Sequence, residues 1–438
     1  MPPWSLRPAR LRSGVDVLIL GSGAREHALA WRLARDEGVG RLGIAPGNGG
    51  TPAVAETVPD LDILDPAAVA RHAARERYDL VVIGPEAPLA AGVADALRAA
   101  SVPTFGPSRA AARLESSKAF AKEQLRRSGV ATASSATFSD VESALAYARA
   151  ADRPPVVKAD WLAAGKGVVV PETAEEAEDA VRSLLDGAAP GATLLLEERL
   201  SGQEVSVFAL VSDESVVPLG AACDYKRLLD DDEGPNTGGM GAYSPVPWFG
   251  AAEVEDAVAA IFEPIAWRMA RDGTPYRGVL YAGLMLTASG PMVLEFNARF
   301  GDPEAQVLLP LLDGDLARAL LGSATRERGV IDGAVALSGR AAVGVVVAAE
   351  GYPTDPVPDR RLLGAEPSSA DDGGPLLCFH AGTRRSTDGA YVSTVGRVVT
   401  VVGLGDDLVS AHETAYRGVG GIQLEGGQHR TDIGLREL

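Results

Sequence analysis

Apolar runs and amphipathic stretches alternate along the first part of the chain. Short β-branched and aliphatic runs, which are typical of buried strands, lie at Val15–Leu20, Leu42–Ala45 and Leu80–Ile83. Stretches with the apolar spacing of helices separate them, at Glu26–Arg35, Pro66–Glu76 and Gly92–Ala100. Strands that alternate with helices indicate a doubly wound α/β domain over roughly residues 14–115.

The pattern changes in the middle of the chain. A helix is expected over Ser117–Ser128, after which short strands and helices alternate to about residue 200. Longer apolar runs then predict an antiparallel-rich sheet, with strands at Val205–Leu210, Val216–Gly220, Gly278–Leu286 and Pro291–Phe296. We expect a loop over the acidic, glycine-rich segment Leu229–Gly241.

The last part of the chain reads as a helical stretch followed by a β-rich unit. Ala305–Arg326 is expected to be mostly helical. Strands are predicted at Ala341–Ala349 and Arg397–Val402, with a helix near Leu408–Tyr416. No internal repeat is evident, so the parts of the chain are expected to be distinct domains.

Composition narrows the class of protein. The chain has 438 residues, of which 46% are hydrophobic and 23% charged, as in soluble proteins of roughly two to four domains. Its net charge of −18 argues against nucleic acid or an anionic membrane as a partner, since both favour a basic surface. No run approaches the length of a membrane span. We expect residues 1–13, which hold three arginines and no apolar core, to be a disordered tail or the result of an over-called start codon, rather than a secretory signal.

The two cysteines, Cys223 and Cys378, are too few for a disulfide framework. They predict reduced thiols in a cytoplasmic protein. The five histidines are scattered along the chain without the spacing of a zinc site.

The segment Pro155–Val170, PVVKADWLAAGKGVVV, contains a Gly-Lys-Gly that suggests phosphate binding. A Walker A loop would need glycine where Asp160 stands and a hydroxyl residue where Gly167 stands. β-Branched runs lie on both sides, so the loop is predicted to join two strands of a hairpin. Its backbone N–H groups could cover phosphates. An ordinary flexible hairpin is the alternative.

Two further turns follow predicted strands of the first domain. Gly21–Glu26 (GSGARE) resembles a dinucleotide fingerprint, but its third glycine is replaced by Glu26 and the acid expected about 20 residues later is missing. A single phosphate at this turn, aided by Arg25, is the functional prediction, and a simple β–α turn is the alternative. Glu86 follows another strand, at the edge of the sheet where ligands bind, although such an acid is often only a helix cap.

The region after residue 290 has the strongest chemical signal. In an extended strand, Glu295, Asn297 and Arg299 point to one face. Carboxylate and amide oxygens suit magnesium, and a guanidinium neutralises a transferring phosphoryl group. A structural ion pair between Glu295 and Arg299 is the alternative.

Charged residues also interrupt apolar segments near the hairpin. Lys158 lies in a predicted central strand, and Lys118 begins the preceding helix. Glu197 and Glu198 end an apolar strand as a possible hinge beside an adenine, and Glu204 is a candidate for the ribose hydroxyls. Charges are seldom buried in strands, so their joint occurrence is informative.

Together these motifs resemble the ATP-grasp superfamily. Within it, the chain resembles the glycinamide ribonucleotide synthetase (phosphoribosylamine–glycine ligase) family over about Val15 to Leu438. The segments that carry the resemblance are GSGAREHALAW (21–31), PGNGGT (46–51), GPEAPL (84–89), LESSKAF (114–120), LAAGKG (162–167), GPNTGGMGAYSP (234–245), EFNARFGDPE (295–304) and FHAGT (379–383).

The resemblance implies a multidomain α/β and α+β protein. The expected parts are a tail (1–13), a phosphosugar-binding α/β domain (14–115), an ATP-grasp small lobe with a lid (116–200), an ATP-grasp large lobe (201–330) and a C-terminal β-rich domain (331–438). The implied reaction phosphorylates glycine with ATP and transfers the glycyl group to 5-phosphoribosylamine. We expect a monomer that uses Mg²⁺ or Mn²⁺.

The resemblance also assigns roles to individual residues. Catalytic roles fall on Arg299, Asp302 and Asp224, and metal binding on Glu295 and Asn297. Nucleotide contacts are expected from Lys118, Lys158, Ala164, Gly165, Lys166, Gly167, Glu197, Glu198, Leu200 and Glu204. Substrate contacts are expected from Gly23, Arg25, Glu26, His27, Asn48, Glu86, Tyr225, Lys226, Asn236 and Gly239.

Two positions depart from the family pattern. Trp161 stands where the lid has glycine, and Tyr225 stands where the family has histidine. We expect these residues to tune the lid and the acceptor site without abolishing the use of ATP. A related ligase for another amino acid or amine, and an inactive ATP-binding regulator, are the alternative functions.

Overall fold

The computed structural model describes residues 14–162, 167–186, 188–327, 331–371, 373–394 and 396–438. The expected tail at 1–13 and residues 163–166 of the Gly-Lys-Gly loop lie outside the described residues.

The N-terminal part is built on a five-stranded parallel sheet in the order β3-β2-β1-β4-β5. Its strands are β1 Val15–Gly21, β2 Val39–Pro46, β3 Glu56–Thr57, β4 Leu80–Ile83 and β5 Thr104–Phe105. The helices are α1 Ala24–Leu33, α2 Pro66–Glu76, α3 Glu86–Ala91 and α4 Val93–Ala99.

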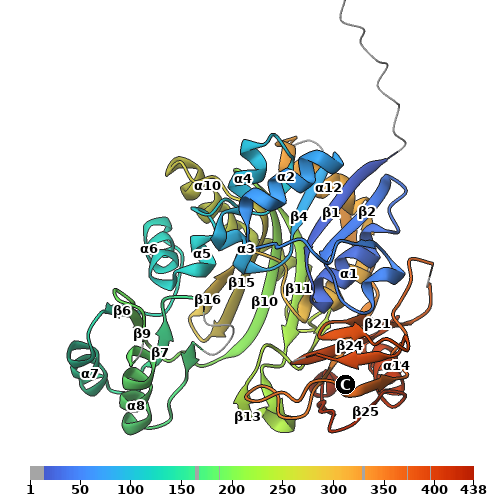
Figure 1. The fold of residues 1–438 in the computed structure, drawn as a ribbon. Helices are drawn as coiled ribbons and strands as arrows, with labels where there is room; N and C mark the ends of the chain where they lie inside the picture. Colours follow the sequence, from blue (N-terminus) through green and yellow to red (C-terminus); the bar gives the residue numbers. More distant parts are fainter. Residues whose placement is uncertain (1–13, 163–166, 187, 328–330, 372, 395) are drawn as a thin grey trace, which may run out of the picture.

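Helices cover both faces of this sheet, as the doubly wound prediction requires (Figure 1). Leu18 and Leu20 of β1 pack in the same cluster as α2 and α4. Val17 and Ile19 pack in another cluster with α1. Because alternate residues of a strand point to opposite faces, a strand that is apolar at every position is buried on both sides.

The small lobe stands apart at the lower left of Figure 1. Its antiparallel sheet has the order β6-β9-β7-β8, formed by β6 Ser135–Phe138, β9 Leu194–Glu197, β7 Val156–Ala159 and β8 Val168–Val169. The helices α7 Val141–Ala150 and α8 Ala174–Leu185 complete a separate small core with this sheet. Lys158 pairs with Val168, which confirms that the Gly-Lys-Gly loop joins two strands.

The largest sheet has eight strands in the order β16-β15-β10-β11-β14-β19-β24-β21. These strands are β10 Gln203–Ser212, β11 Ser215–Asp224, β14 Gly241–Ser244, β15 Arg277–Thr287, β16 Gly290–Asn297, β19 Ala341–Ala348, β21 Leu376–His380 and β24 Arg397–Gly405. All neighbours are antiparallel. Tyr243 of β14 pairs with Val343 of β19, so the C-terminal strands extend the sheet of the large lobe.

The segment expected as one loop over Leu229–Gly241 contains a β-hairpin instead. β12 Arg227–Leu229 pairs with β13 Glu233–Asn236, and the C-terminal segment packs on it. Thr431 Oγ1 donates to Asp230 Oδ2 at 2.5 Å, and Arg430 Nη1 donates to Asp232 Oδ1 at 2.8 Å. These acidic residues, which contributed to the prediction of a loop, therefore have hydrogen-bond partners about 200 residues away in the chain. Local composition does not reveal such partners.

The helical stretch expected over Ala305–Arg326 is interrupted. It comprises α11 Glu304–Leu308, the 3₁₀ turn η4 Leu309–Leu311, β17 Leu312–Gly314 and α12 Leu316–Thr325. Gly314 has a φ of +96°, which breaks a helix, and the Asp315 side chain accepts from Arg318 N to cap α12.

The remaining elements connect and cover these sheets. The helices are α5 Arg113–Ser116, α6 Lys118–Ser128, α9 Ala251–Ala257, the π-helical turn η3 Val258–Phe262, α10 Glu263–Arg271 and α14 Leu408–Val419, with 3₁₀ turns η1 Thr51–Ala53, η2 Asp230–Asp232 and η5 Leu435–Glu437. The short strands are β18 Val335–Leu337, β20 Arg361–Leu363, β22 Thr383–Arg385, β23 Tyr391–Ser393 and β25 Gln423–Leu424. In the described part of the chain, no helix combines the length and the apolar character needed to cross a membrane.

Close packing of α14 on β24 generates a stability prediction. A Cβ on Gly403 would lie 2.1 Å from Ala411 O and 2.3 Å from Ala415 N, so Gly403→Ala forces the helix away from the sheet. We expect a loss of about 1–3 kcal/mol in the free energy of unfolding, measured by urea denaturation. The matched control is Gly373→Ala, because a Cβ at Gly373 meets nothing within 4 Å. Equal stability of the two variants would contradict this packing.

Candidate functional site

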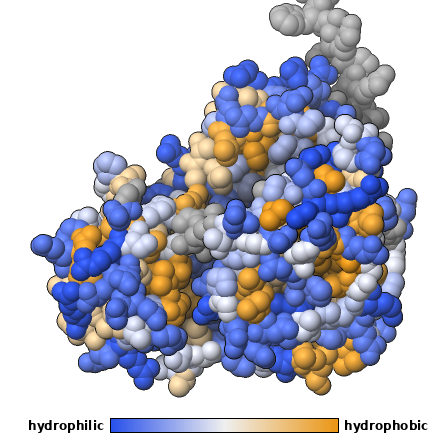
Figure 2. Space-filling model, turned by 60° about the horizontal axis from the view of Figure 1, so that its bottom comes forward, coloured by the Kyte–Doolittle hydropathy of each residue, from blue (hydrophilic) through white to orange (hydrophobic). Residues whose placement is uncertain are grey.

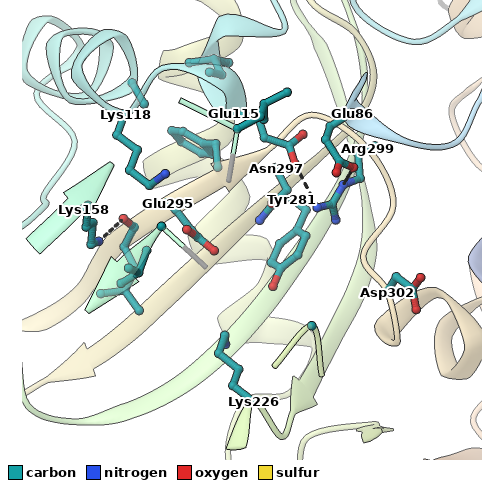
Figure 3. A pocket seen from close by; sticks show the side chains of 18 of the residues that line it. Glu86, Glu115, Lys118, Lys158, Lys226, Tyr281, Glu295, Asn297, Arg299 and Asp302 are labelled. Carbon is teal, nitrogen blue, oxygen red and sulfur yellow. Dashed lines mark hydrogen bonds and ion pairs between the residues drawn. The ribbon is translucent and has the colours of Figure 1, made fainter. Parts of the chain in front are cut away.

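One cavity of about 420 Å³ gathers charged side chains from every part of the fold. Its lining comes from α3, α5 and α6, from the edge of the small lobe, and from the ends of β11, β15, β16 and β24. Figure 2 shows the surface hollowed between the small lobe and the rest of the molecule, and Figure 3 shows the side chains inside.

The predicted metal and phosphoryl residues lie together in this pocket. Glu295 and Asn297 end β16, and Arg299 follows in the turn after it. The guanidinium of Arg299 pairs with Glu115 at 2.9 Å and with Glu86 at 3.4 Å (Figure 3). The alternative interpretation, a structural pair between Glu295 and Arg299, is not among the ion pairs formed by the described residues.

Electrostatics fix the charge state of Arg299. Burial alone lowers the pKa of its guanidinium, but Glu115 and Glu86 outweigh that effect and raise the pKa. Burial raises the pKa of Glu115, while Arg299 and the N–H of Ala298, which donates to Glu115 Oε2 at 2.8 Å, oppose this rise. The cation is therefore permanent and held in place.

Lysines line the side of the pocket next to the small lobe. The buried carboxylate of Glu197 pairs through one oxygen with Lys158 and through the other with Lys122. Lys158 Nζ also donates to Leu294 O at 3.3 Å, directly beside Glu295. Lys158 and Glu295 therefore line the same pocket. Burial lowers the pKa of Lys118, and the nearby carboxylate of Glu295 opposes that shift.

The other predicted hinge residues lie outside the lining of this pocket. Glu198 is exposed and accepts from Ser134 Oγ at 2.9 Å. Leu200 is half-buried. Glu204 pairs with Lys226 at 3.0 Å, which places it beside the pocket through Lys226. Gly167 lines the pocket, whereas Ala164, Gly165 and Lys166 lie outside the described residues.

A second charged group lies opposite the small lobe. Lys226 pairs with Asp224 at 3.0 Å, and both line the pocket with Tyr281 and Glu304. The hydroxyl of Tyr281 donates to Glu304 Oε1 at 2.8 Å. Figure 3 shows the Tyr281 ring in the middle of the pocket, with its hydroxyl on the side where Lys226 lies.

The glycine-rich turn of the first domain is occupied by its own carboxylate. Glu26 Oε2 accepts from Gly23 N at 2.7 Å, and its Oε1 accepts from Arg25 Nε at 2.5 Å. Glu26 is buried, whereas Arg25 reaches the pocket. Glu26 already accepts from a backbone N–H at the N-terminus of α1. An anion bound at this turn would therefore contact Arg25 instead.

Two predicted substrate residues near that turn have internal partners. His27 is fully buried, and its Nδ1 accepts from His380 N at 2.9 Å. Burial lowers the pKa of His27 to about 3, so it is a neutral core residue. Asn48 Nδ2 donates to Ser22 O at 2.8 Å and to His380 O at 2.7 Å, which joins the turn to the C-terminal part.

The C-terminal part reaches the pocket through Arg397. Its Nη2 pairs with Asp302 Oδ2 at 3.1 Å, and its Nη1 donates to Gly238 O at 2.6 Å. Burial raises the pKa of Asp302, but Arg397 outweighs it and holds that pKa below its usual range. Gly239 approaches Pro303 so closely that a Cβ would lie 2.4 Å from Cδ. Asn236 is exposed at the end of β13.

The two positions that depart from the family pattern lie in different places. Trp161 lines the pocket and packs against the small-lobe core. Tyr225 directly follows the end of β11 and is buried between Arg430 and Arg436, whose guanidinium carbons each lie 4.7 Å from the ring centroid. Its hydroxyl accepts from Gly434 N at 2.9 Å. Tyr225 is not part of the pocket lining, whereas its chain neighbours Asp224 and Lys226 are. An effect of Tyr225 on the acceptor site would therefore act through these two neighbours.

Sequence reasoning missed several residues of the pocket: Glu115, Lys122, Tyr281, Glu304 and Arg397. Glu115 and Glu304 lie inside motifs that the resemblance used, so their residue types were a signal. Tyr281 is a polar residue in the apolar run of β15. Arg397 opens a strand about 100 residues beyond the motif that it contacts, and no local pattern indicates it.

The donor set fits a divalent metal bound largely by a nucleotide. No group of three or more His, Cys, Asp or Glu side chains that could hold a metal occurs among the residues described. Glu295 and Asn297 supply two oxygen ligands at one edge of the pocket, and Mg²⁺ commonly takes one or two protein oxygens together with phosphate oxygens and water. The neighbouring lysines suit those phosphates.

Comparison with known families gives matches to three domain models. Residues 15–115 match the phosphoribosylglycinamide synthetase N domain, residues 116–305 its ATP-grasp (A) domain, and residues 342–436 its C domain. The matched ranges contain the parallel sheet, the pocket lysines and β16, and the strands after β18, respectively.

Relatives match the chain along nearly its whole length. A phosphoribosylamine–glycine ligase of Caulobacter vibrioides is 46% identical over 97% of this chain and 99% of its own. One of Streptomyces coelicolor is 48% identical over 96% and 99%. The crystal structure of phosphoribosylamine–glycine ligase from Thermotoga maritima superposes with a TM-score of 0.80 at 33% identity, covering 96% of this chain and all of that one. The expected fold class and family resemblance are confirmed.

The buried position of Tyr225 predicts a role in stability. Tyr225→Phe removes the acceptor for Gly434 N, which should lower the free energy of unfolding by about 1 kcal/mol, measured by urea denaturation. The control is Tyr147→Phe, because Tyr147 is half-buried at the surface of the small lobe and packs by its ring against Phe138. A Tyr225→Phe variant with the same free energy of unfolding as the parent would show that the hydrogen bond from the C-terminal segment to Tyr225 contributes little to stability.

Proposed function

Because the chain belongs to the phosphoribosylglycinamide synthetase family, we propose that it joins glycine to 5-phosphoribosylamine in an ATP-dependent reaction of purine biosynthesis. The products are glycinamide ribonucleotide, ADP and phosphate. The observation that carries the proposal is one pocket that combines Lys118 and Lys158, the oxygens of Glu295 and Asn297, and the guanidinium of Arg299. Such a set suits the transfer of a phosphoryl group to a carboxylate.

In the first step, the γ-phosphoryl group of ATP passes to the carboxylate of glycine. Lys118 and Lys158 hold the phosphates, and Glu197 keeps Lys158 extended toward Leu294 and the metal residues. Arg299 neutralises charge on the transferring group. The adenine lies toward the end of β9, near Glu197.

We assign the metal to Glu295 and Asn297, with Mg²⁺ or Mn²⁺ as the ion. When bound, the ion would supply positive charge to the phosphates of ATP. Glu295 and Asn297 would hold it from the end of β16, and Arg299 follows them in the chain.

In the second step, the amine of phosphoribosylamine attacks the glycyl phosphate and phosphate leaves. We propose that Arg25 and Glu86 face the phosphosugar from the first domain, while Asp224 and Lys226 face glycine. Gly167, at the end of the predicted lid, lines the pocket. Exclusion of water is useful because an acyl phosphate hydrolyses readily.

We place this reaction in the cytoplasm of the cell, catalysed by a monomer. Both cysteines are free and buried, as suits a reducing compartment.

The substrate assignment is tested by measuring ADP release. We expect release that requires ATP, a divalent metal, glycine and phosphoribosylamine together, and an amide product of matching mass. Alanine, serine or β-alanine in place of glycine should give little ADP if glycine is the substrate of this ligase. Preference for another amino acid would favour a recruited ligase, and no amine-dependent release would favour an inactive ATP-binding protein.

The metal assignment is tested by Glu295→Gln and Asn297→Ala. Each should lower metal-dependent kcat by about 10²–10³ while leaving the unfolding transition in place, because both side chains lie at the pocket surface. The matched control is Glu178→Gln, which removes a carboxylate paired with Arg149 at 2.6 Å on the small lobe and should leave kcat unchanged. Full metal-dependent turnover of folded Glu295→Gln and Asn297→Ala is the result that would exclude these ligands.

A further inference from the structure

Glu304 is a pocket carboxylate with an unusual partner. It is only 3% exposed yet lines the cavity. Its Oε1 accepts the hydroxyl proton of Tyr281 at 2.8 Å, and the oxygen of that hydroxyl accepts from Ser206 Oγ at 2.9 Å. Since a phenol has one proton and Ser206 donates to its oxygen, that proton is directed at Glu304.

The other described carboxylates of the pocket are committed elsewhere. Each is either paired with a cation or assigned to the metal: Glu86 and Glu115 with Arg299, Asp224 with Lys226, Asp302 with Arg397, and Glu295 with the metal. A nearby cation favours the charged form of a carboxylate and so makes it a weaker base than it would be without that cation. Glu304 differs because its hydrogen-bond partner is a neutral hydroxyl.

The groups that face Glu304 set its affinity for a proton. Burial and the negative charge of Asp224 raise the pKa of Glu304 to about 7, while the hydroxyl of Tyr281 and the ammonium of Lys226 act in the opposite direction. The guanidinium of Arg299 also interacts with this carboxylate. A general base works best when its pKa lies near the operating pH.

We propose that Glu304 accepts the proton of the attacking amine during the ligation step, and that Tyr281 is the positioning residue that holds its carboxyl group. This inference rests on the proposed function and adds to it the group that moves the proton. The amine nitrogen forms a bond to the glycyl carbonyl carbon, and the C–O bond to phosphate breaks with its electron pair. The proton released from nitrogen passes to a Glu304 oxygen and then to solvent.

The position of Tyr281 favours this role over a purely structural one. Its ring lies between the metal residues and Arg299 in the close-up view (Figure 3), where the amine of a phosphosugar held near Arg25 and Glu86 has to meet the acyl group. Tyr281 is also the register partner of Asn297 across β15 and β16. Glu304 is therefore tied to the strand pair that presents the metal residues.

The test is the pH dependence of kcat for glycine- and phosphoribosylamine-dependent ADP release. In the parent protein, kcat should rise with pH over the range in which Glu304 loses its proton, because only the ionised carboxylate can act as a base. Glu304→Gln should remove this dependence and lower kcat by about 10²–10³, with the KM values for ATP and glycine within about threefold of the parent. Glutamine can still accept from Tyr281, so the fold should persist.

Tyr281→Phe gives an independent readout. It removes a hydrogen bond that favours the ionised carboxylate, so the pKa of Glu304 should rise and the kcat profile should shift to higher pH. The matched control is Tyr276→Phe, because Tyr276 is a buried tyrosine whose hydroxyl donates to Val279 O at 2.7 Å. Its loss should leave the pH profile unchanged.

Three results would overturn the inference. Near-normal kcat in Glu304→Gln excludes a base at this position, and a raised glycine KM with unchanged kcat assigns Glu304 to the ammonium group of glycine instead. An unshifted profile in Tyr281→Phe removes the positioning role. If the parent protein shows no ADP release that depends on both substrates, the proposed function itself is wrong. That outcome is distinct from failure of the base assignment.

Discussion

The pocket depends on pairing opposite charges from segments that are distant in sequence. Arg299 meets Glu115 of α5 and Glu86 of α3, and Glu197 meets Lys122 of α6 and Lys158 of β7. An ion left unpaired in so buried a place costs several kcal/mol. The first domain and the large lobe must therefore meet for Arg299 to be tolerated, and α6 must pack on the small-lobe sheet for Glu197 to be tolerated. The architecture follows from this requirement as much as from the apolar cores.

The eight-stranded sheet also brings a charged residue of the C-terminal part to a partner in the pocket. Pairing of β14 with β19 brings Arg397, at the start of β24, to Asp302 and Gly238. The acidic hairpin of β12 and β13 is covered by the C-terminal segment, with Tyr225 between two arginines. Asp224 and Lys226 thus line the pocket, while Tyr225 between them anchors the connection from β11 to β12 to the C-terminal segment.

Most helices and strands could be predicted from local sequence patterns. Apolar runs and capping residues are physical requirements for such elements to form. The wholly apolar run of β1 and the capped helix α2, where Asp65 precedes Pro66, are clear from the sequence. The Glu295 and Asn297 pair could be predicted because strand alternation is local. The contacts of Glu304 with Tyr281 and of Arg397 with Asp302 could not, because Glu304 lies in α11 and Asp302 in a turn, and each meets its strand partner only through tertiary packing. His27 was misleading for the same reason: its partner, His380, is 353 residues away.

The central claim is that one nucleotide lies between Lys158 and the metal residues on β16. The most direct measurement is a crystal structure of the protein with magnesium and a non-hydrolysable ATP analogue. The account predicts a metal on Glu295 and Asn297, phosphate oxygens within hydrogen-bond reach of Lys118 and Lys158, and the adenine at the end of β9. A nucleotide bound elsewhere, or a metal without Glu295 among its ligands, would contradict it.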